Sequence, residues 1–251
     1  LHNVNLNTIF EAGHTVRSII TCPINTVDCK QLIDVSSIAN KINQTFIGNK
    51  KFSNLPNKLQ MAISGCKEGC NLEETPDVNF DAYSYKSNKI LFSVKITGEH
   101  IGYITPSQVI QTSKAVANIY KEYGNRTDIN KSSFASLVKS WGLKEFNNIL
   151  NSSINFSLKE LILEEDNVAT KGEHFGINKS TIEGESYIGF KVKSLALNSN
   201  DFSSLAKILE KHDASKIKLT NQGNIIILDA PTNNADKLAN DLKKVNFNPF
   251  I

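Results

Sequence analysis

The sequence predicts an α+β fold, in which helices cover one face of small sheets. Short apolar runs of strand length, such as 90–97 and 225–228, alternate with segments whose apolar residues recur every three or four positions. Residues 221–224 form a four-residue turn with one glycine between two such runs, which is typical of a β-hairpin. Helices packed on one face of an antiparallel sheet define the α+β class.

The first part of the chain is expected to be rich in helices. Its expected elements, in order, are a short apolar run at 17–22, a helix at 34–48, strands at 59–65 and 90–97, and helices at 107–120, 132–141 and 146–150. Residues 71–89 are polar, so we expect a loop there. Gly98 and Gly102 are expected to lie in a glycine-containing loop after the second strand.

The second part of the chain is expected to form a compact βαββα unit. Its strands are predicted at 187–194, 216–220 and 225–228. Asp201 is expected to cap the first helix and Thr232 the last, because short polar side chains accept hydrogen bonds from the first helical turn. The mixed, partly acidic segment 151–186 separates the two parts. We therefore divide the chain into residues 1–160 and 161–251.

The charge balance argues against several classes of protein. The net charge of +3 is too small to predict a nucleic-acid partner. The sequence contains no run of about 18 apolar residues, which a membrane-spanning helix would need. No signal peptide is evident, so we expect a cytoplasmic protein. Of the 28 basic residues only Arg17 and Arg126 are arginines, and each is a candidate for a role that needs the planar guanidinium group.

The cysteines form two close pairs about forty residues apart. A chain of this size without a secretion signal does not need disulfide bonds for stability. The pairs therefore suggest a metal or iron–sulfur site, and four unrelated thiols are the alternative. The candidate ligands are Cys22, Cys29, Cys66 and Cys70.

Five segments carry motifs that occur together, in the same order, in one family. They are VRSIITCP at 16–23, LPNKLQ at 55–60, FSVKITGEHIG at 92–102, GNRTD at 124–128 and KIKLTNQGNIII at 216–227. With these motifs the chain resembles the siroheme-containing nitrite and sulfite reductases. GNRTD matches the family pattern in full.

The resemblance implies two half domains. Residues 1–160 are similar to a siroheme/[4Fe–4S]-type half domain, and residues 161–251 to a ferredoxin-like (parachute) α/β half domain. The family repeats such pairs, so the chain looks like the middle of the family architecture. The resemblance therefore suggests a fragment, a split subunit or a chain whose ends were lost, with a second copy or a complementary subunit as partner.

The resemblance also implies roles for individual residues. Arg17 and Lys58 match the catalytic groups that bind the substrate anion and the siroheme carboxylates. Gln60 stands where the family has a second active-site lysine, so one cation and one proton source are absent. The implied cofactor-binding residues are Arg17, Lys58, Gln60, Arg126, Asn221, Gln222 and Asn224.

The cysteine spacing departs from the family pattern. The family motif is C-x5-C followed by C-x3-C, whereas six residues separate Cys22 from Cys29 here. Either the four cysteines hold a [4Fe–4S] cluster with altered spacing, or they are ancestral and the cluster lies in another half domain.

The implied function is a six-electron reduction, of sulfite to sulfide or of nitrite to ammonia. Such an oxidoreductase uses siroheme and a [4Fe–4S] cluster, takes electrons from a ferredoxin-like donor and binds a small inorganic anion. No nucleic-acid or membrane partner is expected. The alternatives are a precorrin-3B synthase-like enzyme on the same fold and a non-catalytic, degenerate siroheme-half scaffold that pairs with another subunit.

Overall fold

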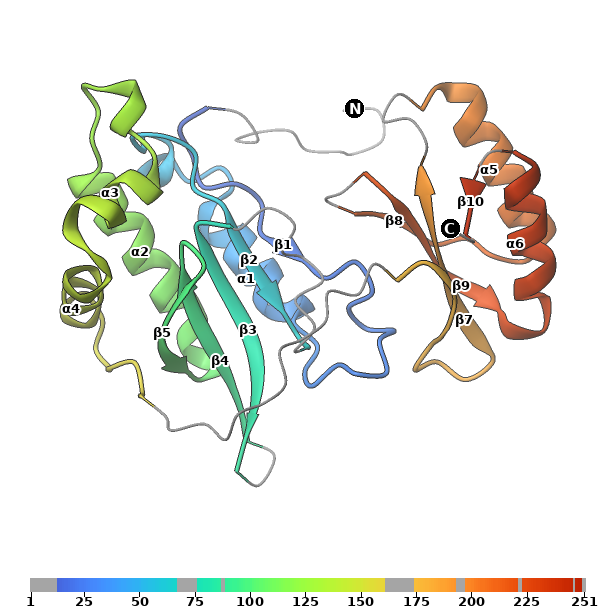
Figure 1. The fold of residues 1–251 in the computed structure, drawn as a ribbon, viewed down its shortest axis with the longest axis horizontal. Helices are drawn as coiled ribbons and strands as arrows, with labels where there is room; N and C mark the ends of the chain where they lie inside the picture. The colour runs from blue at the N-terminus through green and yellow to red at the C-terminus, as the bar shows by residue number, and fades with distance from the viewer. Residues whose placement is uncertain are drawn as a thin grey trace. The chain divides into compact units, whose positions relative to one another are not determined.

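The computed structural model describes residues 13–66, 76–86, 89–160, 174–192, 197–220, 223–245 and 247–249. Its backbone contacts divide the chain into two compact units (Figure 1). Unit 1 consists of Leu1–Thr21, Leu32–Lys67 and Glu74–Ala169, and unit 2 of Cys22–Gln31, Glu68–Glu73 and Thr170–Ile251. The boundary expected at 160/161 stays a prediction, because residues 161–173 lie outside the described part of the chain.

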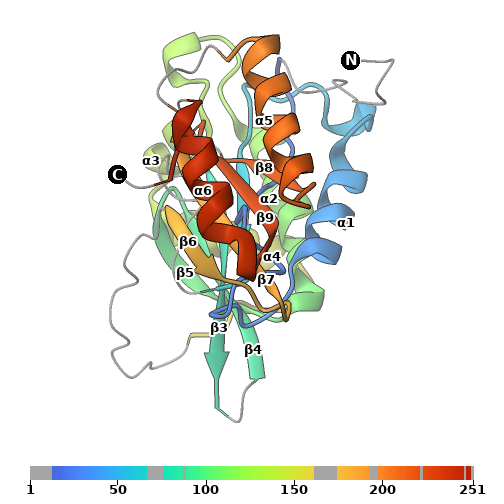
Figure 2. The same cartoon turned by 90° about the vertical axis from the view of Figure 1, so that its right-hand side faces the viewer.

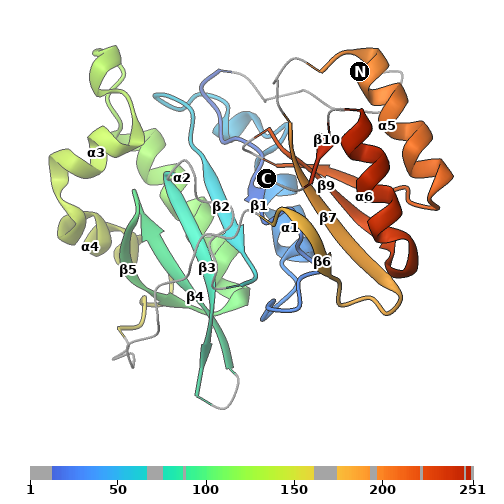
Figure 3. The same cartoon turned by 45° about the vertical axis from the view of Figure 1, so that its right-hand side comes forward.

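Unit 1 is built on a mixed five-stranded sheet. Its strands lie side by side in the order β1 (Ile20–Thr21), β2 (Met61–Ser64), β3 (Val78–Tyr85), β4 (Lys89–Ile96) and β5 (Glu99–Ile104), as Figures 1 and 3 show. β1, β2 and β3 run parallel, whereas β3, β4 and β5 pair antiparallel. The three parallel strands therefore all begin at the same end of the sheet.

Helices cover one face of this sheet and share its core. They are α1 (Ser36–Phe46), α2 (Val109–Tyr123), α3 (Phe134–Trp141) and α4 (Leu143–Ser153), with 3-10 turns at Lys50–Phe52, Pro106–Gln108 and Ile129–Lys131. Val78, Phe80 and Ala82 occupy alternate positions of β3 and are buried among the apolar helix residues. Asn79 and Asp81 alternate with them and lie on the opposite face of the strand.

Two expectations for unit 1 are wrong. Residues 78–85, expected in a polar loop, form β3, because every second residue is apolar enough to be buried against the helices. Gly102, expected in a loop, lies in β5. A Cβ atom on Gly102 would lie 2.7 Å from the Leu158 Cβ, so the close approach of these two chains accounts for a glycine inside the strand.

Unit 2 contains an antiparallel sheet with two helices on one face. The strand order is β10 (Phe247–Asn248), β7 (Glu185–Val192), β9 (Ile225–Pro231) and β8 (Ile217–Leu219), and β6 (Gly176–Lys179) also pairs with β7. α5 (Ser199–Lys211) and α6 (Ala235–Lys244) lie side by side over the sheet (Figure 2). The expected βαββα order is present as β7-α5-β8-β9-α6, and β6 and β10 extend it at its two ends.

The helix caps of unit 2 differ from the expected ones. Asn198 caps α5, because its Oδ1 accepts the N–H groups of Asn200 at 2.8 Å and Asp201 at 3.2 Å. The Asp201 carboxylate accepts the Asn198 N–H in return, which completes a capping box. Thr232 does not cap α6, and its hydroxyl bonds to the Ser186 hydroxyl instead. None of the described helices is both long and apolar enough to cross a membrane.

Candidate functional site

The predicted catalytic residues of unit 1 lie where its parallel strands begin. Arg17 comes three residues before β1, Lys58 and Gln60 come just before β2, and Asp77 comes directly before β3. Backbone pairing joins these segments, since the Arg17 N–H donates to the Leu59 carbonyl at 2.9 Å and the first residue of β3 donates to the Gln60 carbonyl at 3.1 Å. One end of the sheet therefore gathers these four residues.

The Arg17 and Gln60 side chains face away from the apolar core. Val16 and Leu59 pair in a parallel bridge, and both are buried in the core of unit 1. Successive side chains of an extended segment point to opposite faces, so Arg17 and Gln60 point to the face opposite the helices.

The Arg17 guanidinium group does not use all of its hydrogen-bond donors within the described part of the chain. Its Nη1 atom is buried and has no hydrogen-bond partner among the described residues. A buried donor without an acceptor costs roughly 1–3 kcal/mol, and a charged donor costs more. A carboxylate or oxyanion at this point would remove that cost, so Arg17 suits an anionic ligand.

Asp77 is a half-buried carboxyl group that sequence reasoning missed. Its Oδ2 accepts the Gln60 N–H at 2.8 Å. Burial raises the pKa of Asp77 to about 6, although this hydrogen bond and the positive charge of Lys58 oppose the shift. A reading of 78–85 as a strand parallel to β2 would have placed Asp77 beside Gln60.

Lys58 is exposed and projects from a well-anchored turn. Its backbone N–H donates to the Asn57 Oδ1 at 2.8 Å, and the Asn57 amide donates to the Ser132 hydroxyl at 3.1 Å. The backbone of Lys58 is thus held in place, while its ammonium group stays in solvent.

Arg126 is bound to protein carbonyl groups. Its Nη2 donates to the Lys121 carbonyl at 2.7 Å and to the Asn54 carbonyl at 3.0 Å, so it ties the end of α2 to the loop before β2. This is a structural role. The predicted contact of Arg126 with a cofactor stays a prediction.

The predicted hairpin residues belong to unit 2. Asn221 and Gln222 lie outside the described residues. Asn224 is buried, and its Oδ1 accepts the Val192 N–H at 3.3 Å, which joins the hairpin to β7. Its predicted cofactor contact is likewise untested.

The predicted cluster ligands follow the parallel strands instead of preceding them. Cys22 follows β1 directly, and Cys66 comes two residues after β2. The Ser64 hydroxyl holds the Cys66 turn, since it accepts the Cys66 N–H at 3.3 Å and donates to the Cys66 carbonyl at 3.0 Å. Cys29 is exposed in unit 2, and its thiol donates to the Lys179 carbonyl.

The cluster itself stays a prediction. Cys70 lies outside the described residues. Within the part of the chain that the structure describes, no three or more His, Cys, Asp or Glu side chains are grouped to hold a metal. In unit 1 the basic residues and Cys66 lie at opposite ends of β2, whose four residues span about 13 Å at roughly 3.3 Å each.

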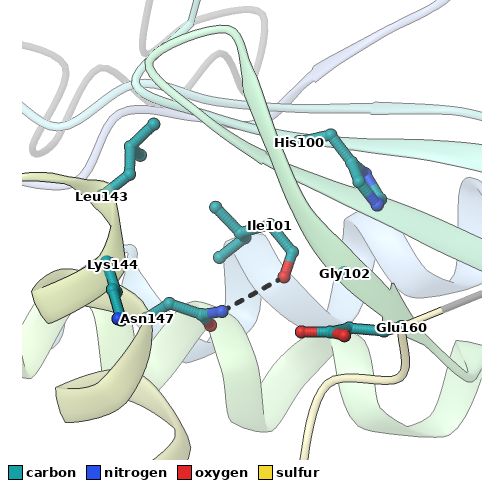
Figure 4. Close-up of a pocket in the computed structure, with 7 residues that line it drawn as sticks. All are labelled: His100, Ile101, Gly102, Leu143, Lys144, Asn147 and Glu160. Atoms are coloured by element: carbon teal, nitrogen blue, oxygen red, sulfur yellow. Dashed lines mark hydrogen bonds between the residues drawn. The ribbon is translucent and has the colours of Figure 1, made fainter.

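A separate pocket of about 320 Å³ lies at the β5 edge of unit 1 (Figure 4). Lys144 and Asn147 of α4 lie on one side of it, and His100 and Glu160 on the other. The Asn147 amide donates to the Ile101 carbonyl at 3.4 Å. Burial, with the charge of Lys95, lowers the pKa of His100. None of the predicted site residues lines this pocket, and its charged side chains are exposed and of both signs.

Residues 12–157 match the family model described as the nitrite and sulphite reductase 4Fe-4S domain. The chain belongs to this family. Residues 181–245 also match the nitrite/sulfite reductase ferredoxin-like half domain. The family predicted from the five motifs is confirmed, and so is a ferredoxin-like second half.

Curated members of the nitrite and sulfite reductase family are similar to nearly the whole chain. The assimilatory ferredoxin-dependent nitrite reductase of Haloferax mediterranei is 24% identical over 95% of the chain and 45% of its own length. The ferredoxin–nitrite reductase of Leptolyngbya laminosa is 26% identical over 86% of the chain and 45% of its own length. The ferredoxin sulfite reductase 2 of Mycolicibacterium paratuberculosis is 23% identical over 97% and 45%. The chain thus spans about half the length of these relatives.

One solved structure of similar fold is that of the Mycobacterium tuberculosis NirA protein. It superimposes on the whole chain with a TM-score of 0.88 at 20% identity, and the match uses 47% of the NirA chain. This similarity confirms the predicted α+β fold.

Proposed function

We propose that the chain forms part of a reductase that takes electrons from a ferredoxin and reduces nitrite or sulfite by six electrons. The buried, unpaired Nη1 of Arg17 carries the proposal, because it is a cationic donor for which the described protein supplies no acceptor. Family membership and the ferredoxin-dependent relatives support the activity.

The proposed cofactors are siroheme and a [4Fe–4S] cluster. Arg17 and Lys58 suit the carboxylate groups of siroheme, and the four cysteines are the proposed cluster ligands. The basic residues and Cys66 are about 13 Å apart along β2, and this separation suits a macrocycle beside a cluster better than a single small ion. When bound, siroheme would supply the iron that holds the substrate, and the cluster would supply the electrons that reduce the substrate.

The protein side chains would hold the anion and move protons. Arg17 presents parallel N–H groups to an oxyanion. Lys58 has a flexible stem and an exposed ammonium group, so it can follow the substrate and donate a proton. Gln60 adds a neutral amide donor, which supplies neither charge nor a proton.

We favour nitrite over sulfite as the substrate. A lysine in place of Gln60 would add one positive charge at this end of the sheet. Its absence weakens the attraction for doubly charged sulfite about twice as much as for singly charged nitrite, since the Coulomb energy scales with the ligand charge. Nitrite should therefore be reduced with the higher kcat/KM.

The test measures the oxidation of a reduced viologen dye by nitrite or sulfite. The protein is purified without oxygen from cells supplied with siroheme. We expect nitrite-dependent oxidation of a reduced viologen, and a loss of roughly 10-fold or more in Arg17→Met and Lys58→Met. The exposed Lys139 provides a matched control, and Lys139→Met should keep full activity. Siroheme-loaded protein that reduces neither anion would favour the precorrin-3B synthase-like alternative. Protein that takes up no siroheme would favour the scaffold.

The partner and the location belong to the same proposal. A second copy or a complementary subunit would appear as a molar mass above that of one chain in solution. A ferredoxin donor would replace the viologen in the assay. The cytoplasmic location stays a prediction.

A further inference from the structure

We infer that Asp77 is a positioning residue, which holds the Lys58–Gln60 segment and through its charge sets how tightly the Arg17–Lys58 site binds an anion. The inference rests on the proposed anion site and adds a pH control to it. Asp77 lay outside the residues predicted from sequence.

The backbone holds Asp77 from both sides. The Thr97 N–H donates to the Asp77 carbonyl at 2.9 Å, and the next residue, Val78, donates to the Gln60 carbonyl at 3.1 Å. The side chain then returns to the same segment, where Oδ2 accepts the Gln60 N–H at 2.8 Å. Asp77 therefore fixes the backbone from which Lys58 and Gln60 project.

Few charged groups face this carboxyl group among the described residues. Lys58 acts on it from the segment before β2, and Tyr120 faces it from α2. From the turn between β4 and β5, the Thr97 N–H contacts the Asp77 backbone carbonyl and not its carboxyl group. Burial and the negative charge of Asp77 raise the pKa of Tyr120 far above its usual range, so this phenol stays neutral. Asp77 is thus the group whose change of charge near pH 6 alters the local potential.

The direction of the pH effect follows from these charges. Above a pH of about 6, ionised Asp77 offsets the positive charge of Lys58. Below that pH, Asp77 is neutral and the positive charge is uncompensated. Anion affinity should therefore rise roughly 3- to 10-fold as pH falls from 7.5 to 5.

The first measurement follows the Gln60 amide of the full chain by NMR. The chain has six glutamines, so selective ¹⁵N-glutamine labelling gives few signals, and Gln60→Asn identifies the relevant one. We expect the Gln60 N–H to shift with a midpoint near pH 6 in the wild-type protein. Asp77→Asn keeps an acceptor oxygen and should abolish the transition, whereas Asp81→Asn on β3 should leave it unchanged. A wild-type Gln60 signal without a transition would overturn the inference, even if Asp77→Asn did not fold.

The second measurement is nitrite binding to the same samples at pH 5 and pH 7.5, where nitrite stays singly charged. The wild type and Asp81→Asn should bind nitrite more tightly at pH 5 than at pH 7.5. Asp77→Asn should bind nitrite at both pH values as tightly as the wild type does at pH 5. Equal wild-type affinities at the two pH values would overturn the inference and leave the anion site standing. Wild-type protein that binds nitrite at neither pH would overturn the site and the inference together.

Discussion

Two side chains at the amino ends of the parallel strands have an electrostatic cost to the stability of the folded protein. Arg17 has a buried guanidinium nitrogen for which the described residues offer no acceptor, and burial raises the pKa of Asp77 to about 6. Both features weaken the folded state at neutral pH. Residues that cost stability are common at functional sites, where a ligand or a proton removes the cost.

The two arginines should respond to the same substitution in opposite directions. Arg17→Met removes a buried donor that has no acceptor among the described residues, so it should leave the free energy of unfolding unchanged or raise it by about 1 kcal/mol. Arg126→Met removes the donors to the Asn54 and Lys121 carbonyls and should lower it by about 1–3 kcal/mol. Urea unfolding of both variants measures the difference. A loss in Arg17→Met as large as that in Arg126→Met would show that Arg17 is a structural arginine.

The pH dependence of stability should report Asp77. The folded-state pKa of about 6 lies above the ordinary value of 3.8, so the folded protein binds the proton more tightly. Asp77 therefore contributes stability at low pH, and this contribution is lost as pH rises from about 4 to about 6. Asp77→Asn should be more stable than the wild type at pH 7.5 by about 1–3 kcal/mol, with a smaller gain at pH 4. An equal difference at both pH values would contradict this.

At the scale of elements, the mixed sheet decides where the site lies. The parallel pairing of β1, β2 and β3 places the segments before them at one end of the sheet and the segments after them at the other. The cationic residues and Cys66 therefore lie at different ends.

Gly102 is the one glycine within the described strands of this sheet, and it should not tolerate a side chain. An alanine Cβ there would lie 2.7 Å from the Leu158 Cβ, and the backbone φ of +145° also disfavours a side chain. Gly102→Ala should lower the free energy of unfolding by about 2–4 kcal/mol. Gly184 has φ +80° but no atom within 4 Å of such a Cβ, so Gly184→Ala should cost only about 1–2 kcal/mol. Equal losses, measured by thermal or urea unfolding, would mean that the contact with Leu158 relaxes.

The sequence predicts most helices and the strongly apolar strands, because their periodicity is local. It does not reveal β3, since Asn79, Asp81 and Ser84 make the segment look polar until the helices bury its apolar face. It does not reveal β5 either, because its glycine resembles a turn residue until the chain at Leu158 is placed beside it. For the same reason Asp77 could not be found, since its contact with Gln60 depends on the pairing of β2 with β3.

At the scale of the whole molecule, the chain contains two parts of the nitrite and sulfite reductase family. Residues 12–157 match the 4Fe-4S domain and residues 181–245 the ferredoxin-like half domain. The chain spans about half the length of its curated relatives. Siroheme uptake should therefore be measured in parallel for the isolated chain and for any co-purifying complex.

The central claim is that Arg17 holds the carboxylate or oxyanion groups of a siroheme-linked site. Siroheme titration of anaerobically purified protein, followed by visible absorption, tests it most directly. We expect saturable binding to the wild type, unchanged binding to Lys139→Met, and a roughly 10- to 100-fold weaker affinity in Arg17→Met, as expected for the loss of a charge-assisted hydrogen bond. Equal affinity of the wild type and Arg17→Met for siroheme would contradict the account.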